Sequence, residues 1–125
     1  MLSRVALIAG LVSTLPACQP QAPPSSATSV EIRKAALADE IESQVAMPKG
    51  AGRLRDYSRF YAEAPDGKIV GLYIRGGSGD LPAGTRRWVR IEALPGIDDG
   101  GCSVVNIVFD LATRKVEKAV CNGLA

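Results

Sequence analysis

The chain has 125 residues, of which 46% are hydrophobic and 22% charged, and its formal net charge is +2. A chain of this length holds one small domain, so two-domain architectures are excluded. The sequence contains no histidine, which excludes Ser-His-Asp and Cys-His catalysis as well as the helical two-histidine zinc site. The nearly balanced charge argues against a nucleic-acid partner.

The N-terminus has the layout of a secretory signal. Arg4 precedes a short apolar run over residues 5–12, and a small residue follows at Ala17. The apolar run is shorter than the roughly 20 residues that a membrane-spanning helix needs. We therefore predict a signal peptide over residues 1–17.

The end of this segment reads Leu15-Pro16-Ala17-Cys18 and resembles the lipobox of bacterial lipoproteins. The resemblance implies cleavage before Cys18, attachment of lipid such as palmitate to its sulfur, and acylation of the new amine. Gln19 in the next position implies sorting to the outer membrane. The expected location is the cell envelope, at the periplasmic face of that membrane. Ordinary secretory cleavage after Ala17 is the alternative.

Residues 18–29 contain the cysteine and a Pro/Ser/Ala segment without periodicity, which predicts a flexible tether. The folded domain is expected over residues 30–125. Apolar residues such as Ile32, Leu37 and Ile41 recur at helical spacing and predict an amphipathic helix over about 29–46.

The remainder of the chain alternates between apolar and polar residues, as strands do. Strands over 57–64 and 68–75 flank a three-residue turn, Pro65-Asp66-Gly67, which predicts a hairpin whose paired residue numbers sum to 132. A second hairpin is expected over 102–110 and 115–122. Between them, a strand over 87–94 follows a glycine-rich loop. These elements predict an α+β fold, with one N-terminal amphipathic helix packed on an antiparallel sheet of about five strands; a partly closed barrel is the alternative.

Two further cysteines, Cys102 and Cys121, would be exported with the chain, and disulfides persist in the periplasm. We predict that they form a disulfide. Their diagonal placement across the hairpin requires a bulge at 100–101 or a shift in the turn. A redox-active pair would need closer spacing, such as C-x-x-C.

No catalytic, metal-binding or cofactor-binding residue is predicted. Asp98 and Asp99 lack the alternating ligands of a calcium loop. The glycine-rich loop over 76–84 lacks phosphate-loop spacing and leads into a strand, so it is interpreted as a mobile connector. Acid–base catalysis by Glu63 or Glu92 would require a concave pocket, so we do not expect an enzyme.

Strand parity assigns Phe60 and Phe109 to the core face and the other aromatic residues to the opposite face, with arginines between them. Tyrosine, tryptophan and arginine are enriched at binding hot spots because they combine a rigid surface with a polar end. The predicted partner-binding residues are Tyr57, Arg59, Tyr61, Tyr73, Arg75, Trp88 and Arg90. Cross-strand stacking on a solvated sheet face is the alternative.

Together these features predict a small lipid-anchored envelope protein that acts as a non-catalytic binding or structural module. Its expected partner, besides the membrane, is another envelope protein or a cell-wall glycan. The alternative is an anchored inhibitor of a periplasmic or extracellular lysozyme or protease, with residues 76–84 as the inhibitory loop.

Overall fold

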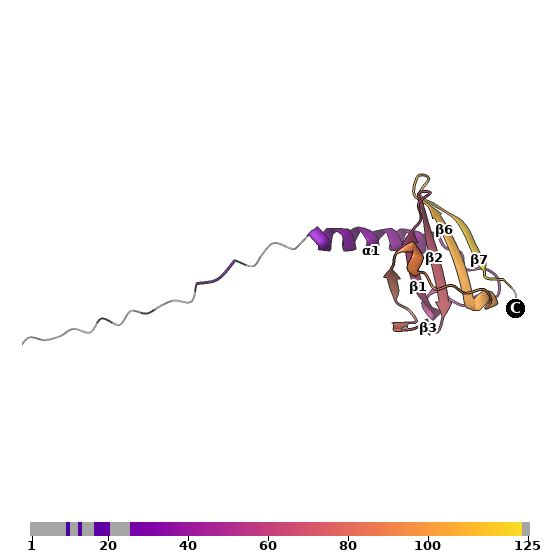
Figure 1. Ribbon diagram of the computed structural model, residues 1–125, viewed down its shortest axis with the longest axis horizontal. Coiled ribbons are helices and arrows are strands. Elements are labelled where there is room, and N and C mark those ends of the chain that lie inside the picture. The colour runs from indigo at the N-terminus through magenta and orange to yellow at the C-terminus, as the bar shows by residue number, and fades with distance from the viewer. Residues whose placement is uncertain (1–9, 11–12, 14–16, 21–25, 124–125) are drawn as a thin grey trace, which may run out of the picture.

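The computed structural model describes residues 26–123, together with Gly10, Ser13 and residues 17–20. One helix packs on a five-stranded, mostly antiparallel sheet, which confirms the predicted α+β class (Figure 1). The predicted signal peptide over 1–17 lies almost entirely outside the described residues, as does the middle of the predicted tether.

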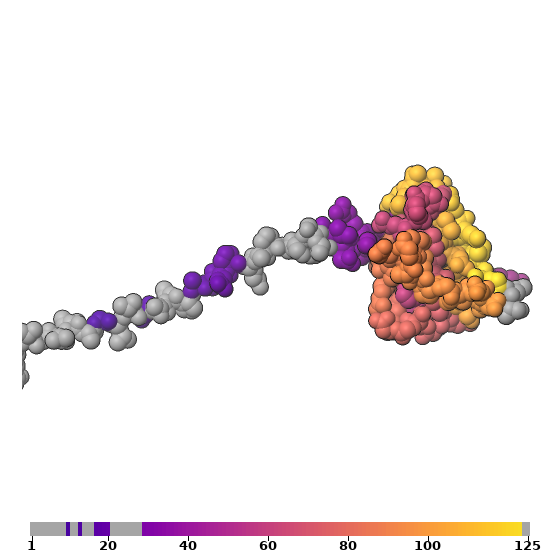
Figure 2. Space-filling model, in the orientation of Figure 1, coloured from indigo at the N-terminus to yellow at the C-terminus, as the bar shows by residue number. Residues whose placement is uncertain are grey.

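Helix α1 spans Ser26–Gln44, so it begins inside the segment predicted as tether. Its second half lies over the sheet, where Ala38 and Ile41 are fully buried. Its first half projects beyond the sheet (Figures 1 and 2). There Val30 is 42% exposed and Ile32 is 63% exposed. We call residues 26–33 the overhang.

Four strands form the antiparallel part of the sheet, in the order β1-β2-β6-β7: β1 (Tyr57–Glu63), β2 (Lys68–Arg75), β6 (Val104–Asp110) and β7 (Lys115–Cys121). The first hairpin has the predicted register, with Tyr57 opposite Arg75 and Tyr61 opposite Gly71. A Cβ at Gly71 would lie 2.9 Å from the Cβ of Ile107. The glycine therefore allows the neighbouring side chains to pack closely over β2.

The fifth strand, β5 (Arg86–Trp88), corrects the prediction of an antiparallel strand over 87–94. It is only three residues long and runs parallel to β1. The reason lies in the connection. Strand β2 ends beside the start of β1 and β6 occupies the other edge of β2, so the returning chain adds to β1 and runs in the same direction. The chain then leaves the sheet through a 3-10 turn over Ile91–Ala93.

The glycine-rich loop before β5 is also more ordered than the predicted mobile connector. It contains a small hairpin of β3 (Gly77–Ser78) and β4 (Leu81–Pro82). Leu81 is only 5% exposed and packs in a hydrophobic cluster with Phe60 and Leu72. The loop is thus anchored to the sheet by one apolar side chain.

The second hairpin forms as predicted, with one irregularity. A register shift between Val108 and Phe109 leaves Glu117 as a bulge in β7 and places Lys118 opposite Val108. The same shift brings Cys121 opposite Val105.

The predicted disulfide is confirmed. Cys102 lies in a 3-10 turn over Gly101–Ser103 and is bonded to Cys121, with the two Cα atoms 4.5 Å apart. The prediction placed the required adjustment at a bulge over 100–101 or in the hairpin turn. It lies instead in the bulge within β7 and in the 3-10 turn before β6.

The sheet has a hydrophobic core on each face. Beneath α1 lie Tyr57, Tyr61, Ile69, Tyr73, Val105, Ile107 and Phe109. The opposite cluster contains Phe60, Leu72, Leu81 and Val104 and is covered by the segment after β5. The assignment of Phe60 and Phe109 to one face is therefore wrong. Alternation shows which residues of one hairpin share a face of the sheet. It does not show which face of the first hairpin is continuous with a given face of the second.

Candidate binding surface

The aromatic face predicted to meet a partner is covered by α1. Tyr57, Tyr61 and Tyr73 are fully buried, and Arg59 is 7% exposed. The prediction that these residues form an exposed surface is wrong, although they do share one face of the sheet. Both faces carry apolar side chains, so parity alone does not show which of them the helix covers. Of the remaining predicted residues, Arg75 and Arg90 are exposed and Trp88 is half-buried.

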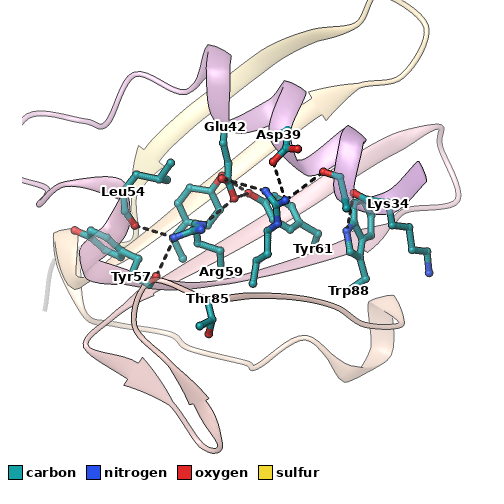
Figure 3. A network of polar contacts seen from close by, with 12 residues as sticks. Lys34, Asp39, Glu42, Leu54, Tyr57, Arg59, Tyr61, Thr85 and Trp88 are labelled. Carbon is teal, nitrogen blue, oxygen red and sulfur yellow. Dashed lines mark hydrogen bonds and ion pairs between the residues drawn. The ribbon is translucent and has the colours of Figure 1, made fainter. Parts of the chain in front are cut away.

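A polar network replaces the predicted surface, and Glu42 of α1 is at its centre (Figure 3). Its Oε1 accepts hydrogen bonds from Arg59 Nε and from the Tyr61 hydroxyl, both at 2.8 Å. Its Oε2 accepts a hydrogen bond from Arg86 at 3.3 Å. The Tyr61 and Tyr73 hydroxyl oxygens lie 2.7 Å apart and share a further hydrogen bond. One carboxylate thus connects the helix to β1 and β5.

Burial controls the protonation of the two network tyrosines. It raises the pKa of Tyr61 far above its ordinary value, and the neighbouring Tyr73 and the Glu42 carboxylate raise it further. Burial also raises the pKa of Tyr73. Among the described residues, no buried side-chain polar atom lacks a hydrogen-bond partner. A fully satisfied network of this kind holds the helix in one position on the sheet.

The accessible part of the predicted surface is its border, around Trp88. The indole N–H donates to the Lys34 carbonyl at 3.1 Å, and the Lys34 ammonium lies 5.7 Å from the ring centroid. Two open grooves meet here. One, of about 300 Å³, is lined by Lys34, Glu63 and residues 88–92. The other, of about 310 Å³, lies between residues 31–35 of α1 and strand β5.

A second accessible feature is the tip of the glycine-rich loop. Residues 76–82 line a shallow hollow of about 320 Å³. Asp80 accepts two hydrogen bonds from the Arg87 guanidinium, at 2.8 and 3.1 Å, and its side chain is 82% exposed. The contact with Arg87 lowers the pKa of Asp80. The loop tip therefore presents an exposed carboxylate that is paired with Arg87.

The three cysteines are used in two ways. Cys102 and Cys121 are bonded, whereas Cys18 is free and exposed. In the described part of the chain, no group of three Cys, Asp or Glu side chains lies close enough together to hold a metal ion. Asp98 and Asp99 are both exposed. No described helix is long and apolar enough to cross a bilayer.

Comparison of the chain with protein-family models, with curated proteins and with solved structures gives no match. Its function is therefore inferred from its residues and their geometry.

Proposed function

We propose that this protein is a lipid-anchored component of the bacterial cell envelope that acts by binding a partner rather than by catalysis. The observation that carries this proposal is the division of the three cysteines. Two form a disulfide inside the domain, and the third, Cys18, is exposed and precedes the domain at the position that resembles a lipobox.

The disulfide supports export, because such bonds persist in oxidising compartments and are rare in the cytosol. The position of Cys18 supports anchoring, because only the seven residues 19–25 lie between it and the start of α1 at Ser26. The eight Cα-to-Cα steps from Cys18 to Ser26, fully extended, span at most about 28 Å. A lipid on Cys18 would therefore hold the domain close to the membrane surface.

Metabolic labelling tests the anchor. The full-length protein, produced in a bacterium fed an alkyne analogue of palmitate, should carry the label and fractionate with membranes. Cys18→Ala should abolish both. The matched control is Cys102→Ser/Cys121→Ser, which should keep the label because it leaves Cys18 in place. An unlabelled wild-type protein in the soluble fraction would contradict the proposal.

The binding role is tested by crosslinking in cells. A photoactivatable side chain at Arg90, beside the first groove, should capture a specific partner. The same group at Lys115, an exposed residue of β7, serves as the control. Equal capture from both positions would place the contact elsewhere.

The ordered glycine-rich loop favours a second candidate function, that of an anchored lysozyme or protease inhibitor. Inhibitory loops act by presenting a rigid segment to an active site. The loop over 76–84 has this character, since its small β3–β4 hairpin is anchored to the sheet by the buried Leu81, and Asp80 at its tip pairs with Arg87. Asp80→Ala should weaken inhibition in assays against lysozymes and secreted proteases while leaving the fold intact. The absence of inhibition by the wild-type protein would rule this function out.

A further inference from the structure

Strand β5 leaves one edge of the sheet open. Arg59 N donates to Thr85 O and Val89 N donates to Tyr61 O, both at 2.9 Å, so the Thr85 carbonyl and the Val89 N–H point toward β1. Main-chain groups alternate in direction along a strand. Those of Arg86 and Trp88 therefore point away from β1, and within the described part of the chain their N–H and C=O groups form no main-chain hydrogen bond with another segment. Two N–H and two C=O groups are available to a further strand.

The overhang of α1 extends past this edge of the sheet. Every described side chain from 29 to 33 is exposed, because the helix continues past β5, where the sheet ends. The groove of about 310 Å³ lies between Glu31, Lys34 and Ala35 of the helix and the three residues of β5. An extended segment placed here would pair with β5 and contact the underside of the helix. Recognition of peptides by strand addition uses this combination of a free edge and flanking side chains.

The charges around the groove favour an acidic occupant. Three of the side chains that line it are basic, namely Lys34, Arg86 and Arg87, and one is acidic, Glu31. Arg86 is held by the carboxylates of α1. Lys34 has no carboxylate partner among the described residues. Arg87 has only Asp80, whose side chain is 82% exposed, and ion pairs of that kind are weak.

The same charges disfavour a second copy of this chain as the partner that pairs with β5. Pairing two β5 edges would bring Arg86 and Arg87 of both copies together, and like charges placed opposite one another across a sheet are destabilising. An extended peptide that carries its own carboxylates meets no such repulsion.

We propose that the groove between the overhang and the free edge of β5 binds an extended acidic peptide, which joins the sheet as a strand beside β5. This inference rests on the proposed binding function and names its site and its class of partner. The acidic segment would belong to another protein of the envelope. Lys34 and Arg87 would contact its carboxylates, and Arg86 and Trp88 would supply the main-chain hydrogen bonds.

The experiment uses the isotope-labelled full-length protein in detergent and a capped heptapeptide of alternating glutamate and valine. Amide exchange of the free protein should be fast at Arg86 and Trp88 and slow at Val89, whose N–H is bonded to β1. Saturating peptide should slow exchange at Arg86 and Trp88 by about tenfold or more. Trp88 is the single tryptophan of the chain, so its fluorescence gives the dissociation constant independently.

Two control peptides separate strand addition from simple charge attraction. The same sequence with its three central amide nitrogens methylated keeps every carboxylate but loses the donors that pairing requires, and it should not bind. A peptide with lysine in place of glutamate tests the charge preference and should bind at least about threefold more weakly. Lys34→Gln should weaken the binding of the acidic peptide by about threefold. Lys49→Gln is the control: Lys49 is exposed and lies outside the groove, so its replacement should leave the binding unchanged.

Three results would overturn the inference: unchanged exchange at Arg86 and Trp88 with saturating acidic peptide, equal binding of the methylated peptide, or slow exchange at both residues caused by self-association without peptide. Each result is measured on residues of the folded domain within the full-length protein, and none depends on whether Cys18 carries lipid. Failure of this site is therefore distinguishable from failure of the proposed anchor.

Discussion

Glu42 of α1 and Arg59 of β1 form an ion pair of 2.8 Å in which the carboxylate and guanidinium side chains are only 14% and 9% exposed. This pair connects the single helix to the middle of the sheet. The same carboxylate also accepts hydrogen bonds from Tyr61 and Arg86. Removing one partner of a buried pair leaves an uncompensated charge, which costs more than the pair itself contributes.

Replacement of Glu42 should therefore destabilise the domain strongly. We expect Glu42→Gln to reduce the free energy of unfolding by about 3 kcal/mol, because Arg59 keeps its buried charge without a counterion. Urea denaturation measures the change. Glu63→Gln is the matched control, since Glu63 is exposed and has no ion-pair partner among the described residues; its effect should stay within about 0.5 kcal/mol. Equal effects of the two substitutions would contradict the role assigned to the network.

The glycine-rich loop should contribute to stability through Leu81. Truncation by Leu81→Ala removes a buried side chain from the cluster around Phe60, and we expect a loss of about 3 kcal/mol. Asp80→Ala, one position earlier, breaks only an exposed ion pair and should cost about 0.5 kcal/mol. Thermal denaturation of both variants measures the difference. A loop that is only a mobile connector would give two small and similar effects.

The disulfide closes a loop between Cys102 and Cys121, which are separated by 19 positions in the sequence. Replacing both cysteines with serine should lower the free energy of unfolding by about 3 kcal/mol, mainly because the unfolded chain gains freedom. Denaturant titration under non-reducing conditions tests this. Cys18→Ser should leave stability unchanged because Cys18 lies outside the folded domain. If reduction of the wild-type protein does not alter its stability, the bond has no such role.

Acid should weaken the contact between β2 and β6 at Asp110. The hydrogen bond from Lys68, together with main-chain N–H groups of Ala112 and Thr113, lowers the pKa of Asp110 to about 2. In the unfolded chain this pKa is about 3.9. The contribution to stability is therefore complete above about pH 4 and is lost as the pH falls toward 2. Stability measured against pH should decline in this window, and Asp110→Asn should show a smaller decline.

Alkali should act on the tyrosines beneath α1. Because the folded-state pKa values of Tyr61 and Tyr73 are raised, stability should be constant below about pH 10 and should fall as the pH rises above it, where the unfolded chain ionises and the folded one does not. Phenolate absorbance should show that these two residues ionise together with unfolding. Ionisation of Tyr61 and Tyr73 while the protein stays folded would contradict their burial.

Local patterns predicted the parts of the fold that depend on neighbouring residues in the chain. The turn at 65–67 determined the register of β1 and β2, and helical spacing located α1 to within a few residues. The pairing of Cys102 with Cys121 followed from their number and expected compartment. In each case the deciding interaction lies within one hairpin or one helix.

The parts that were not predicted depend on contacts between distant segments. The direction of β5 depends on β6 already occupying the outer edge of β2. The burial of Tyr57, Tyr61 and Tyr73 depends on which face α1 covers, and both faces are apolar enough to receive a helix. Glu42 lies among other acidic residues of α1 in the sequence, and its central position is apparent only once Arg59 and Arg86 are brought beneath it.

The two outer edges of the sheet differ in a way that limits polymerisation. On β7, the bulge at Glu117 interrupts the regular ladder, Lys115 and Lys118 add charge, and Gln44 Oε1 accepts the Val116 N–H at 3.0 Å. These devices make β7 a poor template for a neighbouring chain. A fibril that grows strand by strand needs two receptive edges on every molecule. Of the two outer edges of the described five-stranded sheet, β5 alone is receptive, so growth by edge pairing ends after a single addition.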